Sequence, residues 1–455
     1  MYSRRQFIQI GASAAVTAAL AACASKGASS TPTHQTSAGT PGSGGTSSTT
    51  GSTTSSTKSS TTHSTTGSTT GSTTAAPSAG ATTTVSSVLT PGPAGRTLVI
   101  VQLNGGNDAL NTLVPSDGRY RDARPTLAIP ETDLVALKGT TDWSLHPKLA
   151  PLTAYWEAGT ATFLPGIGFN DPNHSHFVSL DRWWRADDLT SSTGWLGRSV
   201  GPDSTKPLYA TALGSGAPLL HSDSFQPAVV IQPGTFAFPG HLGEKVLGRL
   251  ASPVSADQLH ALAQQSMTST IAAVDAFGGL LKSSASGSGD VVSYREGGLD
   301  LINGLDLAAR LVTGNVGARI VVVSVGGFDT HYNQLSVQGT LLDDLAKGID
   351  GFMQKIAAAG ATDKTLLVTT SEFGRRVAEN ASGGFDHGAG GMSMMFGGSV
   401  VGGIQSAVDL GNQLDGDVRP SLDPRTMYTA CLDWLGLDPV AALGKRYDEV
   451  KLLKA

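Results

Sequence analysis

The sequence has few cysteines and few aromatic residues, and it carries no surplus of positive charge. Only two cysteines, Cys23 and Cys431, occur among 455 residues, so the folded part of the chain cannot be built on a disulfide framework. Cys431 stands in an apolar helical context and is expected in the core. Acidic residues outnumber basic ones by 36 to 31, which gives no electrostatic basis for binding nucleic acid. We therefore expect no nucleic-acid partner.

The first 23 residues are typical of an export signal. Arg4 and Arg5 stand in the stretch Ser-Arg-Arg-Gln-Phe-Ile-Gln, which matches the twin-arginine pattern, and a short apolar run follows. The run is short and rich in Ala, Ser and Thr, which argues against a transmembrane anchor. It ends in Leu-Ala-Ala-Cys23 and so resembles a bacterial lipobox, which implies lipidation of Cys23. We expect the export machinery and the membrane as partners, and a location on the outer face of the cytoplasmic membrane or in the cell envelope.

Residues 24–95 are rich in Ser, Thr, Gly, Ala and Pro and are almost free of charge and aromatic side chains. Such a segment cannot bury enough apolar surface to offset its conformational entropy, so we expect a disordered linker. A flexible chain of this length has a root-mean-square reach of about 45 Å. That reach suits a tether between a membrane anchor and a folded domain.

Residues 96–455 are long enough for one large α/β domain. Short apolar, β-branched runs alternate with helical periodicity, which predicts a doubly wound, mostly parallel sheet flanked by helices. The strands are expected at Thr97–Leu103, Thr160–Leu164, Arg319–Val325, Leu366–Thr369 and Met392–Phe396. The helices are expected at Leu149–Ala158, from about Ser175, at Ala256–Lys282, Leu299–Val312, Leu341–Ala359 and Pro424–Leu437, while Leu196–Gly248 reads as irregular.

Acids and histidines follow several of these strands. Asp108 comes just after the first strand, Asp329 and His331 follow another, and Glu372 and Arg375 follow the next. Asp386 and His387 end a glycine-rich loop further along the chain. Because the carboxyl ends of parallel strands lie at one edge of a sheet, these side chains are expected to converge there. Carboxylates and imidazoles together suit a divalent metal.

Ser175 lies where a second strand gives way to a helix, between His174 and His176. Serine is a preferred helix cap, which explains it structurally. The unpaired N–H groups of a first helical turn also favour an anion and help a hydroxyl to act as a nucleophile. Both interpretations remain open, and they do not exclude each other.

The motifs as a set resemble the bacterial family called domain of unknown function 1501. The matching elements are Asn104-Gly-Gly-Asn-Asp108, Ser175-His-Phe177, Gly327-Phe-Asp-Thr-His331, Ser371-Glu-Phe-Gly-Arg375, Asp386-His-Gly388, Leu422-Asp-Pro-Arg425 and Asp433-Trp-Leu-Gly436. That family is similar to the alkaline-phosphatase and sulfatase superfamily. The resemblance implies an alkaline-phosphatase-like fold with one or two divalent metals and a serine nucleophile.

The resemblance also implies a role for each residue. Ser175 would attack and Arg375 would steady the anionic group, while Asp329, His331 and His387 would hold one metal and Asp108 and Glu372 a second. Asn107, His174, His176 and Asp386 flank these positions and would support them. The metal would be zinc, manganese, magnesium or calcium.

Two functions follow as hypotheses, and a third, a role in assembly or as a chaperone for secreted material, is supported only by the expected location. The first is an exported metal-dependent hydrolase of phosphate or sulfate esters, with an anionic ester as substrate. The superfamily usually has an Asp-His pair where this chain has Glu372-Phe373, so one imidazole is missing. The alternative is therefore a non-catalytic surface protein that binds a cell-wall glycan or a secreted partner on the same scaffold.

Overall fold

The computed structural model describes residues 95–201, 206–233, 248–249, 257–283, 294–295 and 298–454. The predicted export signal, with Arg4, Arg5 and Cys23, lies outside the described residues, as does the linker except for Gly95. In the part of the chain that is described, no helix combines the length and the apolar character needed to cross a bilayer.

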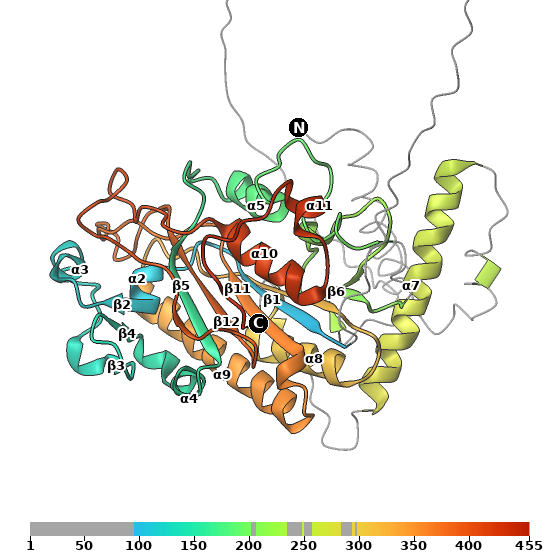
Figure 1. The fold of residues 1–455 in the computed structure, drawn as a ribbon, viewed down its shortest axis with the longest axis horizontal. Helices are drawn as coiled ribbons and strands as arrows, with labels where there is room; N and C mark the ends of the chain where they lie inside the picture. Colours follow the sequence, from blue (N-terminus) through green and yellow to red (C-terminus); the bar gives the residue numbers. More distant parts are fainter. Residues whose placement is uncertain are drawn as a thin grey trace, which may run out of the picture. The chain divides into compact units, whose positions relative to one another are not determined.

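An eight-stranded sheet forms the centre of the fold (Figure 1). Its order is β13-β5-β12-β11-β1-β10-β6-β7, and β12 is the one strand that runs antiparallel to its neighbours. The strands are β1 (Thr97–Leu103), β5 (Ala161–Ile167), β6 (Ala210–Leu213), β7 (Ala228–Val230), β10 (Ile320–Val325), β11 (Thr365–Thr370), β12 (Gly391–Phe396) and β13 (Gly403–Ile404). The mixed, mostly parallel sheet confirms the predicted fold class.

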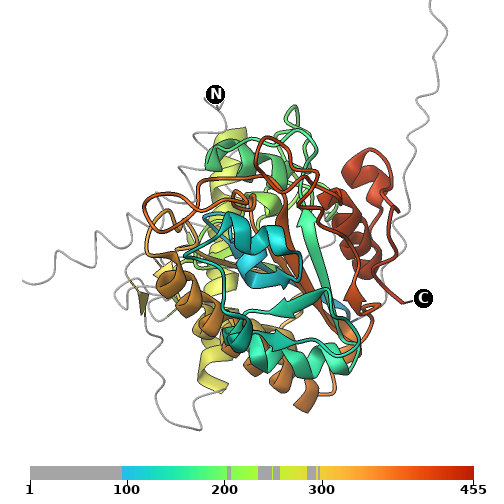
Figure 2. The same cartoon turned by 90° about the vertical axis from the view of Figure 1, so that its left-hand side faces the viewer.

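Helices cover both faces of this sheet. One layer contains α4 (Thr153–Glu157), α7 (Gln258–Ser283), α8 (Leu301–Thr313) and α9 (Gln334–Ala358), with the 3₁₀ helix η3 (Pro147–Leu152). The other contains α5 (His176–Arg185), α10 (Pro424–Leu435) and α11 (Pro439–Leu443), with η4 (Pro218–Leu220). Figure 2 shows α9, in orange, and the red pair α10 and α11 on opposite sides.

The alternation of side chains along β1 explains the two layers. Val99 and Val101 point into the core under α8 and α9, while Leu98 and Ile100 point into the core under α10. All four are buried, as expected for a strand covered on both faces. Each fully buried aliphatic side chain contributes about 1.5–3 kcal/mol through removal of apolar surface from water.

Smaller elements sit beside the sheet. A three-stranded sheet has the order β2-β4-β3, and β8 pairs with β9. The bounds of these elements and of the remaining helices are β2 (Leu113–Pro115), β3 (Val135–Ala136), β4 (Trp143–Leu145), β8 (Tyr294–Arg295), β9 (Gly298–Leu299), α2 (Ala109–Thr112), α3 (Gly118–Ala123), η2 (Glu131–Asp133) and η6 (Thr362–Lys364).

Two predictions about elements were wrong. The stretch predicted as irregular contains strands β6 and β7, which have only four and three residues and therefore leave too short an apolar pattern to detect. Helix α9 begins at Gln334, seven residues before the predicted Leu341. Its first turns are polar because Gln334 and Gln338 make buried hydrogen bonds there, so the apolar periodicity starts late.

Candidate metal centre

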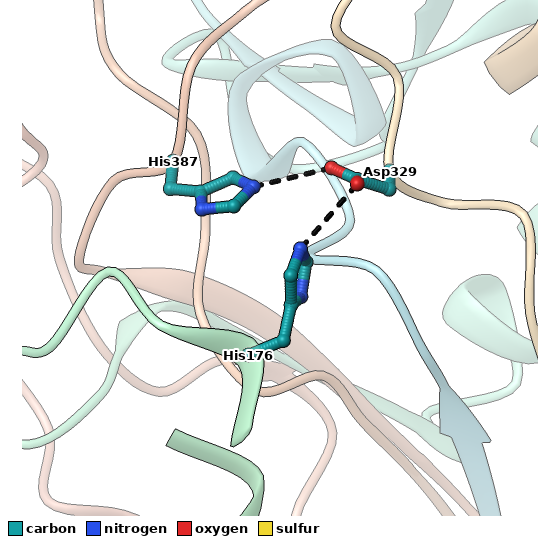
Figure 3. Close-up of side chains that lie close together, drawn as sticks. All are labelled: His176, Asp329 and His387. Carbon is teal, nitrogen blue, oxygen red and sulfur yellow. Dashed lines mark hydrogen bonds and ion pairs between the residues drawn. The ribbon is translucent and has the colours of Figure 1, made fainter. Parts of the chain in front are cut away.

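Three side chains from distant parts of the chain meet at the carboxyl edge of the sheet. His176 opens α5 after β5, Asp329 follows β10, and His387 precedes the antiparallel strand β12, which begins at the same edge. One nitrogen or oxygen atom from each of the three lies within 4.8 Å of the others, and Figure 3 shows Asp329 in contact with both imidazoles. The predicted convergence of strand ends therefore occurs at this position.

A third imidazole lies beside these groups. The Nε2 atom of His331 is 2.9 Å from Nε2 of His387 and 3.1 Å from Oδ1 of Asp329. Asp329 also lies 3.2 Å from Nε2 of His387 through Oδ1, and 3.4 Å from Nε2 of His176 through Oδ2. Zinc–nitrogen bonds of about 2.0 Å place neighbouring atoms of a tetrahedral ligand set about 3.3 Å apart, so these separations are close to those of a metal site.

The outer nitrogens of the imidazoles have acceptors. His176 Nδ1 lies 2.8 Å from Oε1 of Glu372, and His387 Nδ1 lies 2.6 Å from the carbonyl oxygen of His174. A carbonyl only accepts, so His387 carries its proton on Nδ1 and directs a lone pair from Nε2 toward Asp329. Metal-ligating histidines characteristically have such an acceptor on the other ring nitrogen.

One atom of the cluster has its hydrogen-bonding capacity unused. Among the described residues, Nε2 of His176 is buried and has no hydrogen-bond partner. A buried polar atom without a partner costs about 1–3 kcal/mol, and a metal ion bound between His176 and Asp329 would remove that cost. The donor set therefore fits a divalent metal.

Protonation favours the same conclusion for two of the ligands. Burial alone would raise the pKa of Asp329, but the hydrogen bond and charge of Arg375 outweigh it and lower the pKa to about 2. Burial lowers the pKa of His387. At neutral pH the carboxylate is therefore ionised and His387 is neutral, which are the forms that ligate metals. The hydrogen bond to Glu372 raises the pKa of His176.

Glu372 and Arg375 have roles that differ from those predicted. Glu372 is buried and accepts from the Gly105 N–H at 2.8 Å as well as facing His176, so it orients an imidazole. Arg375 is buried, and it donates to Asp329 and to four backbone carbonyls, those of Gly105, Gly106, Phe328 and Phe385. Its side chain is 0% exposed, which leaves no surface for a substrate to contact, so the predicted role in steadying an anionic group is wrong. It holds Asp329 and the surrounding loops instead.

Gly105 allows this arrangement. Its φ is +121°, in the left-handed range that favours glycine, and a Cβ there would collide with the backbone of Asp329. The strand-end loops therefore approach one another closely only with glycine at this position.

Asp108, predicted as a ligand of a second metal, is a buried structural group. Arg124 donates to its two oxygens at 2.7 and 3.1 Å, and Gln334 donates at 2.6 Å. Asn107 belongs to the same network, because its side chain contacts Thr112 and Gln338. Asp108 and Glu372 thus each have other partners, and the predicted second metal site is not formed.

Ser175 is the N-cap of α5, but its side chain makes no capping hydrogen bond. Its N–H donates to Oδ1 of Asn173 at 2.8 Å, and the residue is half-buried. The Ser175 hydroxyl is therefore not used as a cap, and the residue directly precedes His176 in the chain. Asp386, also predicted to support the site, is exposed, and its carboxylate lies 3.5 Å from Nδ1 of His331.

Sequence reasoning missed several residues around the site. Arg124 and Gln334 had no recognisable signal, since neither follows a strand or belongs to a motif. Asp417, which pairs with His174 at 2.7 Å, lies in a loop region without periodicity. His176 was predicted only as a supporting residue, although its Nε2 faces the cluster directly.

Comparison with known proteins gives similarity at low identity. No curated protein matches the sequence. Among solved structures, a lipoteichoic acid synthase from Listeria monocytogenes is 10% identical, with 79% of this chain and 76% of that chain covered and a TM-score of 0.34. A protein in the alkaline phosphatase superfamily from Vibrio parahaemolyticus is 9% identical, with coverages of 78% and 71% and a TM-score of 0.35.

A phosphonate monoester hydrolase from Silicibacter pomeroyi is 9% identical, with 78% of each chain covered and a TM-score of 0.31. The family model described as "Protein of unknown function (DUF1501)" matches residues 303–448. That segment carries Asp329, His331, Glu372 and His387, so the match agrees with the family resemblance of the motifs in this part of the chain.

Proposed function

We propose that the protein is a metal-dependent hydrolase of phosphate or sulfate esters, with Ser175 as its nucleophile. The observation that carries the proposal is the convergence of His176, His331 and His387 on Asp329 through their Nε2 atoms. An arrangement in which lone pairs and a carboxylate face one another is stabilised by a bound cation. Ser175, whose side chain makes no capping hydrogen bond, directly precedes His176 in the chain.

The ligand set favours zinc. Imidazole nitrogen suits zinc and similar transition metals, whereas magnesium, calcium and manganese prefer oxygen ligands. The cluster offers three imidazoles and one carboxylate, so zinc fits better than the other three predicted metals. A single metal is proposed, because Asp108 and Glu372 are bound to Arg124, Gly105 and His176.

A bound divalent metal would neutralise the substrate's negative charge and lower the pKa of a nearby hydroxyl. The chain's own residues would do the rest. Arg375 keeps Asp329 ionised, Glu372 and the His174 carbonyl orient two imidazoles, and the N–H groups of the first turn of α5 would face the anionic group beside Ser175. Ser175 lies next to His176 in the chain, so the nucleophile and one ligand would share a single rigid support.

The location is part of the proposal. Arg4, Arg5 and Cys23 support export by the twin-arginine route and attachment to the cell envelope by a lipid. Substrates would then come from the envelope or from outside the cell. Mass spectrometry of the mature N-terminus, beside a Cys23→Ser variant, tests this part independently of the site.

The test of the function is zinc content and ester turnover of the purified full chain. We expect stoichiometric zinc, turnover of an aryl phosphate or aryl sulfate, and loss of turnover on chelation with recovery after zinc is added. Ser175→Ala should keep zinc and lose about a thousandfold or more in turnover, because a nucleophile is removed without a ligand. Ser336→Ala, an exposed serine on α9, is the matched control and should behave as the wild type.

Two outcomes would contradict the proposal. Unchanged turnover in Ser175→Ala would remove this serine from the mechanism. Absence of metal after reconstitution would contradict the proposal of a metal-dependent hydrolase.

The binding-protein alternative has one observation in its favour. The Phe373 ring packs 4.9 Å from the His176 ring and 4.7 Å from the His387 ring, where the superfamily has an imidazole. Glycan binding by metal-free protein would support it.

A further inference from the structure

Asp417 is a buried carboxylate on a loop that is fixed to the central sheet. Its backbone pairs with that of Leu414 through hydrogen bonds of 3.0 Å, and Gly416 accepts from the Val377 N–H at 3.0 Å. Arg376 and Asp417 also form an isolated bridge. Residues 375–377 lie in the loop after β11, so Asp417 is held by the same segment that supplies Arg375 to the metal centre.

The side chain of Asp417 has a defined partner. Its Oδ2 lies 2.7 Å from Nε2 of His174, while the Asp417 side chain is 2% exposed and that of His174 is 45% exposed. A buried carboxylate without a partner is costly, so this contact restrains the otherwise half-exposed His174. Neither residue is a member of the cluster of His176, His331, His387 and Asp329.

The backbone of His174 in turn reaches the cluster. Its carbonyl oxygen accepts the Nδ1–H of His387 at 2.6 Å, and His176 lies two residues further along the same segment. Asn173 and Ser179 tie this segment to the start of α5, through Asn173 Oδ1 to the Ser175 N–H and a bond from the Ser179 hydroxyl to the Asn173 carbonyl. One short segment therefore orients His387 and presents His176.

We propose that Asp417 is a positioning residue for the metal centre. By holding His174, it fixes the carbonyl that selects the Nδ1–H tautomer of His387 and locates the segment that carries Ser175 and His176. The inference rests on the proposed metal-dependent function, which it deepens by assigning a remote support to two of the ligands. It differs from the role of Glu372, which contacts His176 directly.

Five variants of the full chain separate positioning from general stability. Asp417→Ala and His174→Ala each remove the contact, and the double variant tests whether they act as one unit. Asp417→Asn keeps an oxygen that accepts from His174 Nε2–H, so it should keep the wild-type His387 tautomer and the wild-type affinity for Zn²⁺. Asp415→Asn is the matched control, because Asp415 is an exposed carboxylate two residues away.

The first readout needs no metal. Two-bond ¹H–¹⁵N correlation spectra of metal-free, histidine-labelled protein report the tautomer of His387 at a pH where it is neutral. We expect Nδ1–H in the wild type, in Asp417→Asn and in Asp415→Asn, and a mixture with Nε2–H in Asp417→Ala and His174→Ala. An unchanged tautomer in both alanine variants would overturn the inference.

The second readout is the affinity for Zn²⁺, with the visible spectrum of bound Co²⁺ as a signature of ligand geometry. Loss of an outer support typically weakens metal binding about 10–100-fold, which we expect for either alanine variant, and the double variant should be no weaker. An Asp417→Asn protein as weak as Asp417→Ala would overturn the inference, since the hydrogen-bond acceptor would then not matter. A changed tautomer without turnover of any ester would support the inference while the proposed hydrolase fails.

Discussion

Asp108 and Asp329 are two acids that follow neighbouring strands, and they have different surroundings. They come just after β1 and β10, which pair in parallel, and each meets a guanidinium. The Asp108 side chain is 0% exposed and is enclosed by Arg124 and Gln334, whereas that of Asp329 is 44% exposed and faces three imidazoles. The same sequence signal thus produces a structural salt bridge in one place and a candidate metal ligand in the other.

The covering elements account for the difference. Arg124 lies just after α3 and Gln334 at the start of α9, and together they supply the donors that Asp108 needs. At Asp329 the guanidinium is that of Arg375, which also donates to backbone carbonyls, so the carboxylate keeps capacity for further partners. An acid beyond a strand is therefore available for chemistry only where the neighbouring elements leave its oxygens free.

The largest expected effect is on stability, at Asp108, the carboxylate that Arg124 and Gln334 enclose. Asp108→Ala should lower the free energy of unfolding by about 3–5 kcal/mol, because the buried Arg124 would lose its counter-charge. Zinc stoichiometry of the folded fraction should stay unchanged. Urea unfolding with elemental analysis measures both. Loss of zinc from the folded protein would indicate that Asp108 is a metal ligand after all.

At Asp329 the larger effect should be on metal binding. Asp329→Ala should weaken zinc binding by more than about a hundredfold, because losing a direct ligand costs more than losing an outer support. The unfolding free energy of the metal-free protein should also fall, because buried Arg375 loses its carboxylate partner, but by less than in Asp108→Ala, since Asp329 is 44% exposed. Titration against a competing chelator gives the affinity, with Asp409→Ala as a control at an exposed acid.

A smaller effect separates the two regions by pH. His146 is buried near the Asp108 network, and burial, with the charge of Lys148, lowers its pKa to about 4. A lowered folded-state pKa means stability that is present above the unfolded value of about 6.5 and is lost as the pH falls toward 4, amounting to about 2–3 kcal/mol. Asp329, with its pKa lowered to about 2, contributes stability that is lost only below about 3.8.

Urea unfolding of metal-free protein between neutral pH and pH 4 tests this order. His146→Asn keeps an acceptor for the Lys148 N–H, which His146 caps at 3.1 Å, and removes the titrating group. The variant should therefore show a smaller loss of stability between neutral pH and pH 4 than the wild type. A wild type and variant with parallel pH profiles would show that His146 is not the cause.

The chemistry of the site was only partly predictable. The motifs identified Asp329, His331 and His387, because acids and imidazoles just beyond buried strands stand out locally. The motifs did not indicate that Arg124 would pair with Asp108, because the residue after α3 meets the loop after β1 only in the folded chain. Arg375 likewise matched a motif, but its five acceptors lie on loops far apart in the sequence.

The sequence by itself determined the long buried strands and most of the helices. Apolar runs such as Thr97–Leu103 and Ile320–Val325 have few other stable arrangements in water, because burying them requires a covered sheet. Only the tertiary structure decided which polar side chains at the sheet edge stay free. That choice depends on distances between hydrogen-bonding atoms from separate elements, and neither composition nor periodicity encodes those distances locally.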